Sequence, residues 1–224
     1  MTSRDAPRPG RRVPTQARSR ARYDRILEAA AEEFAARGVD ASTVDDIAAR
    51  AGTSVGSVYQ FFPNKQALYG AIASRYLARA RELFEHWFSV AMAPEGPPWE
   101  ALVDLTVDAF AALDRDGPAF RAIWGNLPHA AQALGEAYAI NREIAARVAL
   151  LLERHAPTLH PARRDLVATT VVETMTALLF VAARAEDPPF SDAMVAEAKV
   201  LLKRYLAPYA RGAEAPRDPG TPTA

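Results

Sequence analysis

The feature that most constrains the fold is a helical hydrophobic period that continues through nearly the whole sequence. From about residue 23 to residue 207, apolar side chains recur every third or fourth position, and glycine or proline interrupts the pattern at intervals. This spacing predicts α-helices, because a half-buried strand would alternate apolar and polar residues. Hydrophobic residues make up 50% of the 224, enough to form a core. The sequence therefore predicts an all-α chain of about nine helices.

Glycine, proline and capping residues set the expected helix boundaries. Gly38 ends the first helix, since glycine enters the left-handed conformation without a steric penalty. Thr43 precedes the second helix, with Asp46 in the capping-box position. Pro63 closes the third helix, and Asn64 caps a long fourth one. The expected helices cover about 23–37, 44–51, 55–61, 65–90, 99–115, 118–125, 128–155, 162–185 and 190–207.

Charge is distributed unevenly although the net charge is zero. Residues 1–25 contain eight arginines against Asp5 and Asp24, a local charge of +6. We expect residues 1–21 to form a disordered basic arm and residues 211–224 a disordered tail, because both lack a hydrophobic period. On charge alone, the arm fits a nucleic-acid contact and a solvated tail equally well.

Several functional classes lack their sequence signatures. The chain has no cysteine, which excludes disulfides and thiolate metal sites, and its four histidines are not at ligand spacing. No phosphate loop, nucleophile elbow or paired-carboxylate pattern occurs, so we expect neither an enzyme nor a bound cofactor or metal. The N-terminus has no apolar signal core, which predicts a cytoplasmic protein. The apolar run 166–183 suggests either a membrane span or a buried helix, and its threonines and Glu173 favour the buried helix.

The segment from Thr43 to Lys65 carries the functional signal. Two short helical stretches meet at the tight turn Gly52-Thr53-Ser54, and small Ala48 lets them approach closely. This is the pattern of a helix-turn-helix, whose second helix enters a DNA major groove. The expected apolar seam with helix one consists of Ile47, Ala51, Val55, Val58, Phe62 and Phe34.

The same region resembles the signature of the tetracycline-repressor (TetR) family over about residues 22–70. The resemblance implies a three-helix DNA-binding domain at 22–70 and a helical effector-binding and dimerisation domain at 71–210. The matching positions are Ile26-Leu27, Ala29-Ala30, Phe34, Gly38, Thr43, Ile47-Ala48, Ala51-Gly52, Ser54, Gly56, Tyr59, Phe61-Phe62, Lys65 and Leu68. Gln60 departs from the aromatic residue or histidine often found there, so the operator sequence is not carried over.

The third helix and its neighbours supply the candidate DNA contacts. Amides at its first turn suit a phosphate, and Gln60 can pair with an adenine edge. Phe61 can touch a thymine methyl, while Thr43 and Lys65 are placed to hold the backbone. The full set is Thr43, Ser54, Gly56, Ser57, Tyr59, Gln60, Phe61, Lys65 and Arg22.

Large side chains gather after residue 75, where the resemblance implies an effector pocket. They suggest either a small-molecule site or a plain helical core. Glu173 is the one charge in its apolar run, so it is expected to hold a ligand or to pair with Arg142 or Arg147. Asn126 is another polar candidate. The candidate ligand residues are Trp87, Phe110, Phe120, Trp124, Tyr138, Glu173, Thr176 and Phe180.

The last two expected helices, 162–185 and 190–207, are apolar on more than one face. The surplus face predicts a homodimer, whose two-fold symmetry would match a palindromic operator. The sequence thus predicts a repressor released from double-stranded operator DNA by a small, largely apolar effector, with no membrane partner. The alternatives are an all-α enzyme or carrier with an incidental helix-turn-helix, and an architectural DNA binder without an effector.

Overall fold

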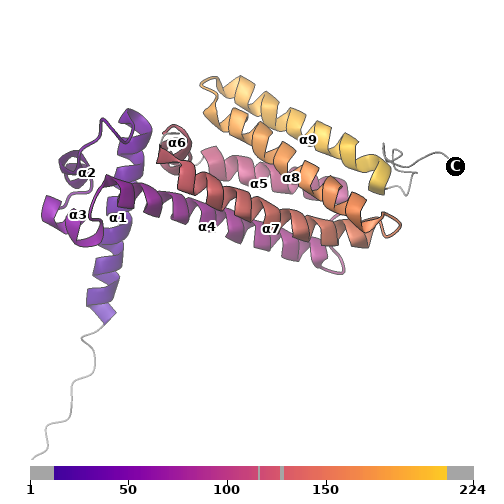
Figure 1. The fold of residues 1–224 in the computed structure, drawn as a ribbon, viewed down its shortest axis with the longest axis horizontal. Coiled ribbons are helices and arrows are strands. Elements are labelled where there is room, and N and C mark those ends of the chain that lie inside the picture. Colours follow the sequence, from indigo (N-terminus) through magenta and orange to yellow (C-terminus); the bar gives the residue numbers. More distant parts are fainter. Residues whose placement is uncertain (1–12, 116, 127–128, 211–224) are drawn as a thin grey trace, which may run out of the picture.

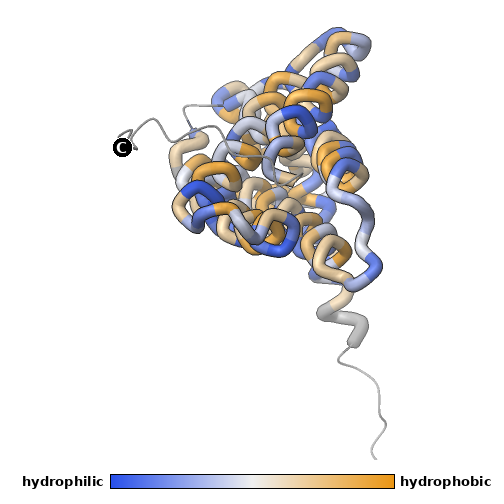
Figure 2. The backbone as a smooth tube through the Cα atoms, turned by 90° about the vertical axis from the view of Figure 1, so that its right-hand side faces the viewer, coloured by the Kyte–Doolittle hydropathy of each residue, from blue (hydrophilic) through white to orange (hydrophobic). Residues whose placement is uncertain are grey.

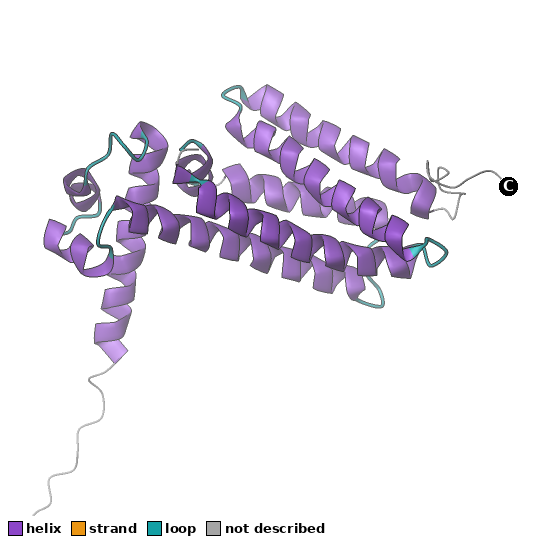
Figure 3. Cartoon of the chain, viewed as in Figure 1, coloured by secondary structure: helices purple, strands orange, loops and turns teal. Residues whose placement is uncertain are grey.

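The computed structural model describes residues 13–115, 117–126 and 129–210. Within these ranges the chain is helical without strands, which confirms the predicted all-α class (Figure 1, Figure 3). The helices are α1 (Val13–Arg37), α2 (Val44–Arg50), α3 (Val55–Phe61), α4 (Lys65–Met92), α5 (Trp99–Arg115), α6 (Pro118–Trp124), α7 (Ala131–His155), α8 (Pro161–Arg184) and α9 (Pro188–Ala210).

The helices form a small N-terminal group and a longer bundle. Figure 1 shows α1, α2 and α3 gathered at one end of α4, while α5, α7, α8 and α9 run along the rest of the molecule. Bands of apolar and polar residues alternate along the tube in Figure 2, as amphipathic helices require. Helix α4 belongs to both groups, because its first turn adjoins α1–α3 and its later turns pack in the bundle.

Side-chain caps begin α2, α3 and α4, and those at Thr43 and Asn64 were predicted. Thr43, Ser54 and Asn64 each accept a hydrogen bond from the backbone amide three residues later, at the starts of α2, α3 and α4. Gly38 and Gly52 have φ of 81° and 61°, so each turn uses a conformation that L side chains rarely adopt. The two glycines therefore set the directions in which the chain leaves α1 and α2.

Helix α1 begins at Val13, ten residues before the predicted start near residue 23. The proposed disordered arm at 1–21 was therefore too long, because residues 13–21 are helical. Alanine, arginine and glutamine in this stretch have high helix propensity and need no apolar face to extend an existing helix. The arm's remaining residues 1–12, and the tail 211–224, lie outside the described residues.

Among the described residues, one helix is long and apolar enough to cross a membrane, judged by length and composition alone. It is α8, Pro161–Arg184. It packs on α7 and α9 in the bundle, yet only 28% of its most apolar window is buried within the chain. The predicted burial of this helix within the protein is therefore incomplete. One face lies in the core, through Val167, Val172 and Leu179, while Leu166 and Val181 on the other face are exposed.

Candidate functional site

Helices α2 and α3 form the predicted helix-turn-helix. Ile47 and Ala48 of α2 and Val58 of α3 are buried in one cluster with Ile26 and Phe34 of α1. The amide of Thr53 donates to the carbonyl of Ala48 at 3.0 Å, which closes the turn between the two helices. Burying one face of each short helix against α1 supplies the stability that seven-residue helices lack alone.

The opposite face of α3 is open to solvent. Tyr59 is 52% exposed and Gln60 is exposed beside it. Gly56 is exposed, and a Cβ added there would meet no atom within 4 Å, so a ligand backbone can approach closely. Ser54 and Ser57 face each other across the first turn, with their hydroxyl oxygens 2.9 Å apart. This surface offers a phenol, an amide and two hydroxyls to a groove or to phosphates.

Phe61 is less available than the sequence suggested. Its ring is half-buried and packs edge-on against Tyr23 of α1, with centroids 5.8 Å apart. Phe62 lies on the same Tyr23 ring at 5.0 Å and is buried. The side chain of Phe61 therefore helps to hold α3 on α1 and presents only part of its ring outward.

Lys65 makes intramolecular contacts. Its ammonium donates to the carbonyl oxygens of Val39, Asp40 and Ser42 at 2.7, 3.1 and 2.8 Å. These three bonds use all three ammonium hydrogens. Lys65 thus ties the turn between α1 and α2 to the start of α4, and it positions the domain without a free hydrogen for a phosphate.

Thr43 also has internal partners, because its hydroxyl donates to Asp46 Oδ2 at 2.6 Å and accepts from the Asp46 amide at 3.1 Å. These bonds, and Arg37 and Arg50 nearby, lower the pKa of the exposed Asp46 carboxyl. The buried Glu33 binds the guanidinium groups of the same two arginines at 3.2 and 3.0 Å, which fastens α2 to α1. These arginines are committed to the fold, whereas Arg22 on α1 is exposed.

Asn126, just beyond α6, joins the helix-turn-helix domain to the bundle. Its Oδ1 accepts from the amide of Val39 at 2.8 Å, and its Nδ2 donates to the carbonyl of Ala122 at 2.7 Å. A Cβ on Gly38 would lie 3.2 Å from Asn126 Oδ1, so the turn and the amide are closely fitted. The proposed role of Asn126 in holding an effector is not supported, because both ends of its amide serve this junction.

Two further contacts fix α6 in place. The hydroxyl of Tyr69 on α4 donates to the carbonyl of Ile123 at 2.9 Å, and Arg184 on α8 donates to the carbonyl of Trp124 at 2.8 Å. Both carbonyls belong to the end of a helix, where backbone acceptors lack intrahelical partners. Helix α6 is therefore bonded to α4 and α8 at once.

A buried acid lies between α4 and α5. The hydroxyl of Tyr76 donates to Asp114 Oδ1, and Asp114 is buried. Burial raises the pKa of Asp114 to about 6, which the hydrogen bond from Tyr76 partly opposes. Burial and the neighbouring carboxylate also raise the pKa of Tyr76.

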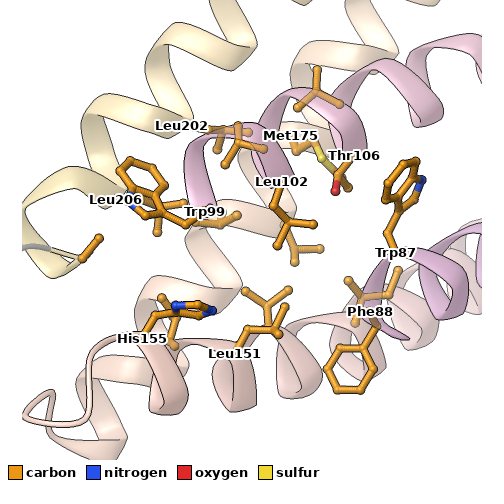
Figure 4. A pocket seen from close by; sticks show the side chains of 18 of the residues that line it. Trp87, Phe88, Trp99, Leu102, Thr106, Leu151, His155, Met175, Leu202 and Leu206 are labelled. Atoms are coloured by element: carbon orange, nitrogen blue, oxygen red, sulfur yellow. The ribbon is translucent and has the colours of Figure 1, made fainter. Parts of the chain in front are cut away.

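An apolar cavity of about 140 Å³ lies inside the bundle, between α4, α5, α7, α8 and α9 (Figure 4). In Figure 4, Trp87 and Phe88 stand at one end of it, and His155 and Leu206 stand at the other. The lining residues are Phe84, Trp87, Phe88, Trp99, Leu102, Val103, Thr106, Val107, Ile144, Val148, Leu151, Leu152, His155, Ala156, Val171, Val172, Met175, Leu202, Leu206 and Ala210.

Of the predicted ligand residues, Trp87 lines this cavity and the other seven do not. Phe120, Trp124 and Phe180 pack on one another with ring centroids 5.8–6.5 Å apart, in the core that joins α6 to the small domain. Phe110 packs beside the cavity in two neighbouring apolar clusters. These aromatics therefore pack in the helical core, which was the alternative to ligand binding that the sequence left open.

The remaining three predicted residues lie on the surface. Tyr138 is 61% exposed, and Glu173 and Thr176 are exposed on α8. The expected burial of Glu173 and its pairing with Arg142 or Arg147 were wrong, because its carboxylate accepts from the side-chain amide of Asn141, 3.4 Å away, and lies on the surface. An apolar run does not reveal which of its faces is buried, and Glu173 falls on the exposed one.

The sequence did not single out Trp99, Thr106 and His155 as ligand candidates; the first two lie on α5, and the third ends α7, far along the chain. The spacing of Trp99, Thr106 and Val103 on one face of α5 was an available signal, but it does not distinguish a cavity wall from a packed core.

Comparison with known proteins agrees with this architecture. Residues 26–72 match the family described as "Bacterial regulatory proteins, tetR family". Residues 98–206 match "Tetracyclin repressor-like, C-terminal domain". The two matches cover the helix-turn-helix domain and most of the bundle, including helices α5 to α8.

Curated relatives match part of the chain. The HTH-type regulator YvdT of Bacillus subtilis is 41% identical over 56 residues, 25% of this chain and 29% of its own. The chain therefore spans under a third of that relative. The HTH-type regulator TtgW of Pseudomonas putida is 34% identical over 99 residues, 42% of this chain and 67% of its own.

Solved structures cover nearly the full length. A TetR-family regulator from Streptomyces coelicolor aligns with a TM-score of 0.55 at 29% identity, covering 84% of this chain and 99% of its own. A complex of SmeT with triclosan aligns with a TM-score of 0.62 at 22% identity, covering 92% and 98%. The second of these similarities establishes the fold alone.

Proposed function

The chain belongs to the TetR family of transcriptional regulators, which bind DNA and are not enzymes, and we propose that it is a dimeric cytoplasmic repressor that a small apolar effector releases from its operator. The observation that carries this proposal is the continuity of α4. Its first residue, Lys65, donates a hydrogen bond to the turn before α2. The same helix places Phe84, Trp87 and Phe88 in the cavity wall. A ligand that shifts α4 therefore acts on the helix-turn-helix domain directly.

The proposed DNA contacts come from the open face of α3 and the start of α1. Tyr59 and Gln60 are exposed at the centre of α3, and the first-turn amides near Gly56 can approach a phosphate. Arg22 is exposed on the N-terminal part of α1, where it can lie along the DNA backbone. Ser54, Ser57, Thr43 and Phe61 border this face, and Lys65 acts behind it.

We propose that α8 and α9 form the dimer interface. Large apolar side chains are exposed on both helices in the single chain, which is costly in water unless a partner covers them. Half of the ten such side chains recorded among the described residues lie on these two helices: Leu166, Val181, Phe190, Val200 and Leu201. A two-fold pair would present two α3 helices to successive major grooves, about 34 Å apart.

Effector release requires a difference in affinity between two conformations. A molecule that fills the cavity more favourably when α4 is displaced shifts the population toward that state, whereas equal binding to both states shifts nothing. Helix α6 opposes motion of α4 through the Tyr69 bond, and Asn126 holds the α1–α2 turn. The triclosan complex of the SmeT neighbour involves a small ligand, consistent with such a site on this fold.

The test begins with operator fragments selected from random duplex DNA by the wild-type protein. Gln60→Ala and Tyr59→Ala should each weaken binding by about 1–3 kcal/mol, or roughly 5- to 150-fold, because each removes a groove or backbone contact. Tyr138→Ala, at another exposed tyrosine that lies in the bundle, serves as the matched control and should leave affinity unchanged. Wild-type affinity in both α3 variants, with unchanged circular dichroism, would contradict the proposed recognition surface.

A further inference from the structure

The cavity wall carries no full charge. Among its described lining residues there is no lysine, arginine, aspartate or glutamate, and Thr106 supplies the one hydroxyl. His155 is the one titratable side chain in this lining, and it is exposed at the end of α7. Figure 4 places His155 at the end away from Trp87, while Thr106 lies nearer to Trp87 and Met175.

Charged groups near the cavity are paired outside it. Lys203 of α9 binds both carboxylate oxygens of Asp104 at 2.7 and 2.9 Å, and Lys199 binds Asp108 at 2.5 Å. These pairs join α9 to α5 along the outside of the wall that Thr106 and Val103 line. Neither the ammonium groups nor the carboxylates are available to neutralise a charged ligand inside.

The same arrangement holds on the side formed by α4 and α7. Arg147 pairs with Glu85, and Arg154 donates to the carbonyl oxygens of Met92 and Ala93 at 2.7 and 3.3 Å. Burying an ion in a site without a counter-charge is strongly unfavourable, because the ion loses its hydration and gains no partner. The wall therefore discriminates against anions and cations alike.

Thr106 provides a different kind of selectivity. Its hydroxyl has no hydrogen-bond partner within the described part of the chain, and it lies toward the end of the wall where the buried indole Nε1 of Trp87 also lacks a partner. A hydroxyl can donate one hydrogen bond and accept others. A few such groups in an apolar pocket orient a ligand without requiring it to carry a charge.

We infer that the effector is an electrically neutral, mostly apolar molecule whose single uncharged polar group binds the Thr106 hydroxyl. This inference rests on the proposed function, since it concerns the ligand of the same cavity. The volume of about 140 Å³ is close to the roughly 150 Å³ of engineered apolar cavities that bind benzene, so one aromatic ring is a suitable core.

Four probes of one skeleton test the inference: propylbenzene, and phenylpropanol, phenylpropanoate and protonated phenylpropylamine with the polar group at the chain end. Binding is measured by calorimetry and by the fluorescence of Trp87 and Trp99, which line the cavity. The alcohol should bind the full-length protein most tightly. The two ions should bind about a hundredfold or more weakly, because the wall offers them no counter-charge.

Substitutions at Thr106 test the hydroxyl contact. Thr106→Val, which keeps the shape, should weaken phenylpropanol about fivefold and leave propylbenzene unchanged, whereas Thr106→Ser should retain the preference for the alcohol. Thr176→Val, at an exposed threonine of α8, is the matched control and should change neither affinity. Melting temperatures of all variants establish that they are folded.

The outcomes separate this inference from the proposed function. Tight binding of either ion that also releases operator DNA overturns the neutral-ligand inference and leaves effector release standing. Binding of neutral probes without loss of operator affinity supports the inference about the cavity and counts against effector release. If none of the four probes binds at millimolar concentration, the inference is wrong, while operator binding by the α3 face is tested independently.

Discussion

Asn126→Ala should destabilise the junction between the helix-turn-helix domain and the bundle. Val39 is buried, and its amide loses its acceptor when the Asn126 side chain is removed. A buried donor left without a partner costs about 1–3 kcal/mol. The carbonyl of Ala122 loses its bond as well, which adds about 1 kcal/mol.

The expected loss is therefore about 3 kcal/mol in the free energy of unfolding. For a chain of this size such a loss lowers the Tm by about 6–12 °C, at roughly 2–4 °C per kcal/mol. Asn126→Asp should recover part of the loss, because a carboxylate still accepts from Val39 but cannot donate to Ala122. Operator affinity should fall with stability, since Val39 follows the glycine that directs the chain toward α2.

Urea denaturation at one fixed protein concentration measures the loss, because the stability of a dimer depends on concentration. Hydrogen exchange over residues 34–42 gives a local measurement, and the Val39 amide should lose protection. Asn141→Ala is the matched control, because that amide makes only long contacts of 3.4 and 3.5 Å to Glu173 and Thr176. If Asn126→Ala and Asn141→Ala lose the same small amount, and residues 34–42 exchange as in wild type, the junction argument is refuted.

Three further predictions concern the DNA, the dimer and pH. Arg22→Gln should reduce the slope of log binding constant against log salt concentration by about one unit, because one phosphate contact is lost. An unchanged slope would show that Arg22 does not contact the DNA. Leu201→Glu should dissociate the dimer, as measured by light scattering, whereas Leu150→Glu, at a similarly exposed leucine on α7, should not. If both variants remain dimers, α9 is not the interface. The pKa of Asp114 is raised from 3.8 to about 6, so the stability it contributes is present below about pH 4 and is lost as pH rises through 6. Asp114→Asn should abolish this pH-dependent part, and identical pH profiles of urea stability would contradict it.

The helix-turn-helix was readable from the sequence because its determinants are local. Gly38 and Gly52 mark left-handed turns, and Thr43 and Ser54 cap helices through the amide three residues away. Each signal depends on residues within one turn of the chain. The exposure of Tyr59 and Gln60 followed equally from the helical period, since Val58 and Phe62 occupy the buried side.

The partners of Lys65 and Asn126 were not readable in this way. Lys65 reaches carbonyl groups 23–26 residues earlier, and Asn126 reaches an amide 87 residues earlier. A lysine at a helix start and an asparagine in a loop have the same local signature whether they bind DNA, a ligand or a backbone turn. Only the folded arrangement of α1, α4 and α6 distinguishes these roles.

The amino-acid sequence by itself determined the class of fold, most helix boundaries and the helix-turn-helix, because helical periodicity and capping are properties of neighbouring residues. Tertiary structure decided which of the many apolar faces enclose space. Phe120 and Phe180 fill a core, whereas Trp99, Thr106 and His155 border a cavity, although all five lie on helices of similar pattern. A cavity is the volume that helices far apart in the chain fail to fill when they pack, so no single segment encodes it.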